Sequence, residues 1–147
     1  MPKKIKVPQP INEPHLMGIY TSPMYPISYA IGQHNVAMVE AFLEAGANPN
    51  IDLGNGWTPL HKAFDYAIDA MNQDSRETPH PEIIKIMKLL VKHGASLDNV
   101  DARGLNPLDI INEYSYDREG FNTLLSFFKP VYPNIEELID YDGYIQD

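Results

Sequence analysis

The sequence predicts an all-α fold, a short solenoid of helix pairs linked by hairpin fingers, in which the middle repeat is enlarged. Three observations support this prediction. A tight turn that leads into a helix recurs at Pro26, Pro59 and Pro107. Two predicted helices end on Gly-Ala, at Gly46 and Gly94, and apolar residues of the predicted helices recur at three- and four-residue spacing. Internal repetition of this kind is typical of stacked repeats.

The first 20 residues form a predicted Pro-rich N-terminal arm. Residues 1–14 carry four prolines and no helical period, so we expect an extended segment that lies over the first repeat or stays loose.

The first predicted repeat covers residues 23–50 and the second covers residues 51–98. Pro26 begins one helix, and residues 38–47 supply a second helix that ends at Gly46. In the second repeat, Thr58 can cap the free amides of a helix whose first turn holds Pro59. The face of the following helix that must be buried carries apolar residues at helical spacing: Ile83, Ile84, Met87, Leu90 and Val91.

The second repeat contains a predicted insertion near residues 66–81. Residues 67–72 continue the helix that starts at Pro59, and residues 73–81 are a polar return loop. A longer helix would raise a ridge beside its neighbours, where loops commonly carry function. A neutral, tolerated insertion is the alternative.

The third predicted repeat covers residues 99–129. Residues 101–109 repeat the turn and the helix start, and residues 123–128 predict a last outer helix. Residues 130–147 are predicted as an acidic capping segment and tail, in which Ile135, Leu138 and Ile139 have helical spacing. The tail, with Tyr141 and Tyr144, either solubilises the protein or docks into a basic cleft of a partner.

Two seven-residue segments rich in Asn, Asp and Gly, 50–56 and 98–104, have the composition of hairpin fingers. Together with Thr58-Pro59-Leu60-His61 and the Gly-Ala ends, they resemble the ankyrin-repeat family. Gly56 and Gly104 are 48 positions apart, against a common ankyrin period of about 33, which agrees with the insertion. Ser28 and Asp109 replace the motif His, and Asn106 replaces the motif Thr. These departures weaken the terminal repeats as consensus members, as expected of caps.

Composition limits the possible functions. Twenty acids against 11 bases give a net charge of −9, and no Lys or Arg occurs from Val7 to His61. Such a chain repels phosphate backbones, so nucleic acid is not expected as a partner, whereas a basic protein is. No run of 18 apolar residues and no secretory pattern occurs, which predicts a cytoplasmic protein without a membrane partner. The free chain is expected to be a monomer.

No catalytic pattern stands out, so an enzyme is the least favoured class. The five histidines show no zinc-binding spacing, and no cysteine is present. No catalytic residue, cofactor or metal is therefore predicted. The ankyrin resemblance implies that His61 is structural and bonds the neighbouring turn.

The ankyrin resemblance also implies where a protein partner would bind, on the finger tips and the inner helices. Aromatic groups there would form a wall, and acids would fringe it. The alternative is that Trp57 packs on the adjacent finger and the tyrosines fill grooves between repeats. The predicted partner-binding residues are Tyr29, Gln33, Asn55, Trp57, Lys62, Asp65, Tyr66, Asp69, Arg103, Leu105, Glu113, Tyr114 and Asp117.

A small acidic binder with few repeats is similar in overall character to the immunity proteins that neutralise bacterial toxins. The predicted function is therefore a non-enzymatic inhibitor that blocks a basic toxin or enzyme domain, with electrostatic steering toward it. The alternative is an ankyrin adaptor that tethers a host or signalling protein without inhibiting it.

Overall fold

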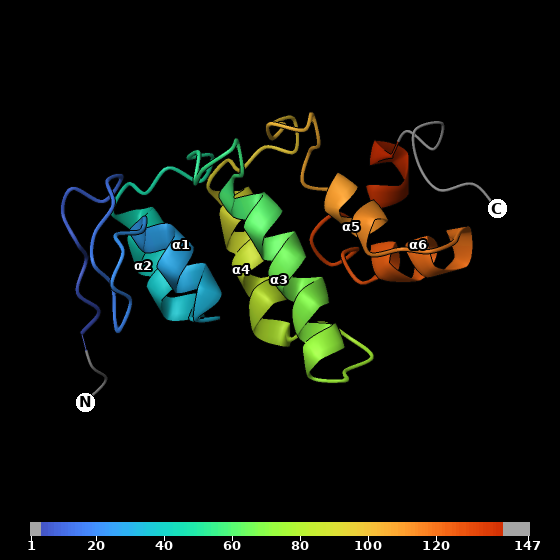
Figure 1. The fold of residues 1–147 in the computed structure, drawn as a ribbon, viewed down its shortest axis with the longest axis horizontal. Helices are drawn as coiled ribbons and strands as arrows, with labels where there is room; N and C mark the ends of the chain where they lie inside the picture. Colours follow the sequence, from blue (N-terminus) through green and yellow to red (C-terminus); the bar gives the residue numbers. More distant parts are fainter. Residues whose placement is uncertain (1–3, 140–147) are drawn as a thin grey trace.

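The computed structural model describes residues 4–139, and within that range the regular structure is helical (Figure 1). The inner helices are α1 (Pro26–Gly32), α3 (Pro59–Gln73) and α5 (Asp109–Glu113). The outer helices are α2 (Val36–Glu44) and α4 (Pro81–Lys92), followed by α6 (Arg118–Ser126) and the short 3-10 helix η1 (Ile135–Leu138). Among the described residues, β-pairing is limited to an isolated bridge between His15 and Met24. The all-α prediction is confirmed.

Helices that follow each other in the chain pair off, and the pairs stack side by side. In Figure 1, α2 and α4 lie behind α1 and α3, and helix α3 also packs against α5. A single apolar core runs through this stack. Its largest fully buried side chains include Phe42, Phe64, Phe121 and Phe128.

The predicted helix starts and ends of the first two repeats are present. Thr58 caps α3, with Pro59 in its first turn. Gly46 and Gly94 follow α2 and α4 with φ values of 99° and 100°, a left-handed conformation that glycine adopts at little cost. Helix α3 runs on to Gln73, so the expected extension of the inner helix is present.

The last predicted helix needs correction. We predicted residues 123–128, but α6 spans Arg118–Ser126 because the side chain of Asp117 accepts a hydrogen bond from the Gly120 N–H and starts the helix earlier. Phe128 then lies beyond the helix, buried against Phe64 with ring centroids 4.7 Å apart.

The segment after α6 folds back on it, because η1 packs against α6. Ile135 and Ile139 are buried, but Leu138 is exposed, so the short capping helix expected here is one 3-10 turn with a narrower apolar face. Residues 140–147, which include Tyr141 and Tyr144 of the predicted tail, lie outside the described residues.

The N-terminal arm lies on the first repeat. Ile11 and Met17 are buried in the core. The Asn12 amide N–H donates to the carbonyl of Gly46, and its oxygen accepts from the Asn48 N–H. Asn50 makes the same pair of bonds one repeat later, to Gly94 and Ser96. The arm therefore replaces a preceding repeat at this joint.

The extended α3 and the five-residue α5 differ greatly in length. The C-terminal half of α3 therefore projects past α5, and Figure 1 shows α6 running across the direction of α3. None of the described helices is both long enough and apolar enough to cross a membrane.

Candidate functional site

An open groove of about 650 Å³ lies where the two fingers meet the N-terminal half of α3. We call it the first groove. It is bordered by Ser28 of α1 and by Ala102 of the second finger. Six predicted partner-binding residues line it: Asn55, Trp57, Lys62, Tyr66, Arg103 and Glu113. The groove therefore brings together predicted residues from helices α3 and α5 and from both fingers.

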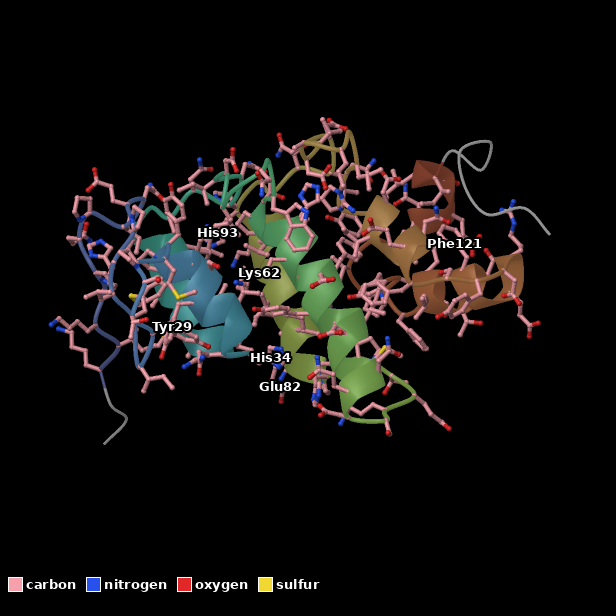
Figure 2. The ribbon with its side chains drawn as sticks, in the orientation of Figure 1. Tyr29, His34, Lys62, Glu82, His93 and Phe121 are labelled. Atoms are coloured by element: carbon pink, nitrogen blue, oxygen red, sulfur yellow. The ribbon has the colours of Figure 1, made fainter. Side chains whose placement is uncertain are left out.

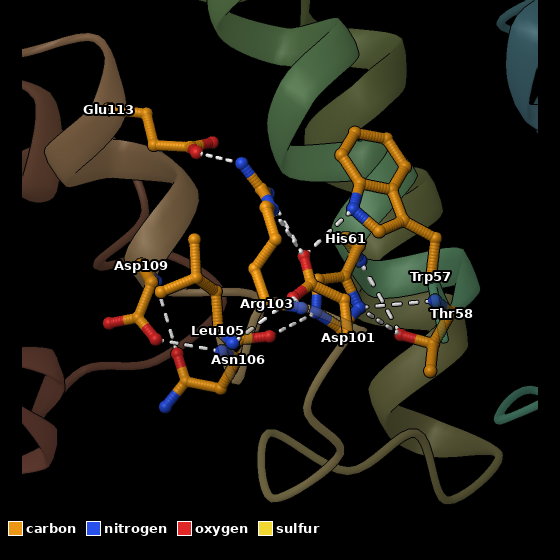
Figure 3. Close-up of polar contacts among 9 residues, drawn as sticks. All are labelled: Trp57, Thr58, His61, Asp101, Arg103, Leu105, Asn106, Asp109 and Glu113. Atoms are coloured by element: carbon orange, nitrogen blue, oxygen red, sulfur yellow. Dashed lines mark hydrogen bonds and ion pairs between the residues drawn. The ribbon is translucent and has the colours of Figure 1, made fainter. Parts of the chain in front are cut away.

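Asp101 holds the edge of this groove in place (Figure 3). Its buried carboxylate accepts hydrogen bonds from the Trp57 indole N–H at 3.1 Å and from the Arg103 guanidinium at 2.9 Å. It also accepts from the backbone N–H groups of Arg103 and Leu105. Arg103 in turn pairs with Glu113. The groove edge is therefore cross-linked from the first finger to α5.

Asp101 stays ionised well into acid. Its burial alone would raise its pKa. The hydrogen bonds from the Leu105 N–H and from the side chain and N–H of Arg103 outweigh burial and lower the pKa to about 2.

The two fingers are in direct backbone contact. The Ala102 N–H donates to the carbonyl of Asn55 at 2.8 Å. Gly56 has a φ of +79°, and a Cβ there would lie 2.8 Å from the Cα of Asp101. Glycine is therefore required at Gly56 for the fingers to approach this closely.

The start of α3 is tied to the second finger through His61. Nδ1 of His61 accepts the Thr58 backbone N–H at 3.1 Å, and Nε2 lies 2.8 Å from the carbonyl oxygen of Leu105. His61 therefore carries its hydrogen on Nε2. The structural role expected for His61 is confirmed.

The third repeat rebuilds the same arrangement with other residues. The Asn106 N–H donates to the Asp109 carboxylate at 2.7 Å, and the Asp109 N–H donates to the Asn106 side-chain oxygen at 3.0 Å. The replacements of Thr and His that we expected to weaken this repeat thus compensate each other. The first repeat has no such pair, because Tyr25 does not cap α1 and Ser28 instead accepts from Lys62.

Lys62 crosses the groove floor from α3 to α1. Its ammonium donates to the Ser28 hydroxyl at 2.6 Å and lies 5.0 Å from the ring centre of Tyr66. Burial lowers the pKa of Lys62, although Asp65 opposes this. Lys62 forms no ion pair with any described residue.

The four aromatic residues of the predicted wall do not all line the first groove: Trp57 and Tyr66 line it, whereas Tyr29 and Tyr114 do not. Trp57 stacks on His61, and Tyr66 packs against Gly32 of α1. Tyr29 meets Tyr20 edge to face, and in Figure 2 it lies across α1 from Lys62.

Tyr114 donates its hydroxyl to Asp65 at 2.6 Å. Its pKa is raised by burial and by that carboxylate. The alternative, in which these side chains pack between repeats, therefore describes Tyr114. It also describes the contact of Trp57 with Asp101 of the adjacent finger and the contact of Tyr66 with Gly32.

The remaining predicted residues are placed as follows. Asp69 accepts a hydrogen bond from Gln73, and Asp117 caps α6. Gln33 is exposed at the end of α1. Leu105 is half-buried and contributes mainly its backbone. None of these four lines the first groove.

Sequence reasoning missed Asp101, Ser28 and Tyr20. A signal for Asp101 was present, because Asp52 in the first finger accepts N–H groups two and four residues ahead, as Asp101 does. Ser28 was noted only as a departure from the motif. Tyr20 lies in an irregular segment, where no period marks its position.

A second groove of about 470 Å³ lies between the projecting end of α3 and α6. It holds Tyr114 and Asp117 from the predicted set, with Glu77 of the insertion loop and the fully exposed Tyr116. Within residues 4–139 no group of three or more His, Asp or Glu residues could hold a metal ion.

The model of the ankyrin repeat family matches residues 55–104, which run from the first finger tip through α3 and α4 to the second finger. The chain carries an ankyrin repeat. A similar solved structure is the ankyrin repeat domain of Bcl-3, described as a unique member of the IkappaB protein family. The match has 21% sequence identity and a TM-score of 0.46. It covers 68% of this chain and 36% of that chain. Ankyrin repeats indicate a protein-binding module.

Proposed function

We propose that this chain is a non-enzymatic inhibitor of the immunity type, which covers a basic surface of a toxin or enzyme domain with its first groove. The observation that carries the proposal is the pre-formed edge of that groove, where Asp101 fixes Trp57 and Arg103. Large side chains that are held rigid before binding lose little entropy on binding, and Trp and Arg are frequent in energetic hot spots.

Charge supports a basic partner. The first groove is balanced, because Lys62 and Arg103 face Asp101 and Glu113. The molecule as a whole has a net charge of −9, which raises the rate of encounter with a basic surface. In this proposal the groove provides the complementary contacts, and the net negative charge raises the association rate. In this proposal the free protein is a cytoplasmic monomer.

The proposal is tested by blocking the groove without removing any of its hydrogen bonds. Ala102 is exposed and lines the first groove, so Ala102→Arg adds bulk and a positive charge there. Ala37 on α2 is also exposed, and Ala37→Arg makes the same change on an outer helix. Wild type and both variants serve as bait in lysate of the native host, and each captured domain is assayed with and without bait.

We expect one basic domain to bind wild type and Ala37→Arg and to lose its activity. Its affinity for Ala102→Arg should fall about ten-fold or more, because like charges are brought together in a closed contact. Capture with full activity would favour the adaptor. Equal capture by both Arg variants would refute the first groove as the binding site.

A further inference from the structure

The second groove has an apolar floor and an acidic border. Met71 of α3, Leu124 of α6 and Phe127, which directly follows α6, supply apolar surface. Tyr116, which also lines the groove, is a fully exposed residue. The groove exists because α3 projects past the short α5, so it is a direct product of the insertion.

The border of this groove carries charge of one sign only. Glu77, Asp117 and Glu119 line it, and no Lys, Arg or His does so. Asp117 accepts the Gly120 N–H at 2.7 Å. The neighbouring Arg76 donates to the Thr78 carbonyl of its own loop. The first groove, in contrast, is lined by charged side chains of both signs.

We propose that the second groove docks a short basic segment of the partner protein. A Lys or Arg side chain fits this chemistry, because its aliphatic stem can lie on Leu124 and Phe127 while its charged end reaches the carboxylates. The ring of Tyr116 offers a face to the same cation. The proposal rests on the proposed function in one respect, that the partner is basic.

Other occupants fit less well. An acidic peptide or a nucleic acid would face the three carboxylates that line the groove. A purely apolar segment would cover those carboxylates and strip their water without pairing them. A basic segment can cover the apolar floor with its aliphatic stems and pair its charged ends with the carboxylates of the border.

The probe is a nine-residue peptide of three Gly-Leu-Arg units with an N-terminal fluorescein, followed by fluorescence anisotropy. Glu77→Gln with Glu119→Gln removes two border charges from exposed side chains. The matched control is Glu40→Gln with Glu44→Gln on α2, which makes the same change in net charge elsewhere. Trp57 is the only tryptophan and lines the first groove, so its emission reports on the first groove alone.

We expect the border variant to raise the Kd about five-fold and the α2 control to change it less than about two-fold. Tyr116→Ala should weaken binding, and a Gly-Leu-Glu peptide should not bind. Adding the peptide should leave Trp57 emission unchanged, and Ala102→Arg should bind the peptide with the wild-type Kd. These two results would show that peptide binding is independent of the first groove. Equal weakening by the border and α2 variants would overturn the proposal, as would a peptide-induced shift of Trp57 emission.

Discussion

At the scale of single residues, Asp101 does most to shape the first groove. One buried carboxylate accepts hydrogen bonds from an indole, a guanidinium and two backbone amides. Removing such an acceptor leaves donors inside the protein without a partner, which costs more than the net value of one hydrogen bond. The groove therefore depends on a residue that hardly reaches its surface.

Asp101→Asn should lower the free energy of unfolding by about 2 kcal/mol near neutral pH, since the new amide places an N–H beside existing donors. The pKa of Asp101 is about 2 in the folded protein against an ordinary 3.8. The unfolded chain therefore binds more protons between these values. The stability that the charge supplies is complete above about pH 4 and is lost as pH falls through 2.

Urea unfolding of wild type and Asp101→Asn from pH 6 to pH 2 measures this effect. The difference between the two proteins should shrink as the pH falls below 4. The exposed Asp98→Asn is the control and should change stability little. A difference that stays constant down to pH 2 would contradict the role given to the Asp101 charge.

Residues of the first groove could be predicted from the sequence where their place in the repeat is enough to put them on the surface. Trp57 and Arg103 follow from the finger positions of the ankyrin resemblance. Their partner Asp101 is 44 residues from Trp57 in the chain, and no local pattern reports such a contact. Tyr29 and Asp69 were placed on the correct helices, but the groove does not extend to them.

At the scale of elements, local chemistry predicted most helix starts. Thr58, Pro59 and His61 act within one turn, so their pattern is visible in the sequence. The start of α6 was missed because Gly120, a poor helix former, lies in its first turn while Asp117 caps it. The predicted helix also included the apolar Phe127 and Phe128, so its predicted end came after the observed end at Ser126. Phe128 is buried instead by packing against the distant Phe64.

The joints between repeats also belong to this scale. Asn50 bridges to Gly94, Ser96 and Asn99, whereas Asn12 of the arm bridges to Gly46 and Asn48. Both Asn12 bonds are exposed to water, whereas the Asn50 bonds to Ser96 and Asn99 are partly buried. A hydrogen bond that is exposed to water contributes less net free energy to folding, so the Asn12 joint should stabilise the fold less than the Asn50 joint.

Asn50→Ala should lower the free energy of unfolding by about 1–2 kcal/mol, and Asn12→Ala by about half as much. Urea unfolding measures both. Asn122→Ala on the exposed face of α6 is the control, with an expected change within about 0.5 kcal/mol. If Asn50→Ala were as mild as the control, the joint would not depend on this side chain.

At the scale of the whole molecule, an excess of acids opposes the compact state. Twenty Asp and Glu residues against 11 Lys and Arg residues give a net charge of −9. Within the part of the chain that the structure describes, Arg103 pairs with Asp101 and Glu113, and Lys129 pairs with Glu136. The acids outnumber the bases by nine, so Lys and Arg cannot neutralise all of the negative charge. A surface of this kind is stabilised by screening.

We expect the urea midpoint of the wild type to rise between 10 and 150 mM NaCl, because the Debye length falls from about 30 to about 8 Å and repulsion between acids weakens. A variant with Glu40→Lys and Glu44→Lys on the exposed side of α2 changes the net charge from −9 by +4, to −5. Its midpoint should respond less to the same salt. An equal response in the two proteins would mean that the salt effect does not come from net charge. A fall in the wild-type midpoint would mean that ion pairs such as Arg103 with Asp101 outweigh the repulsion.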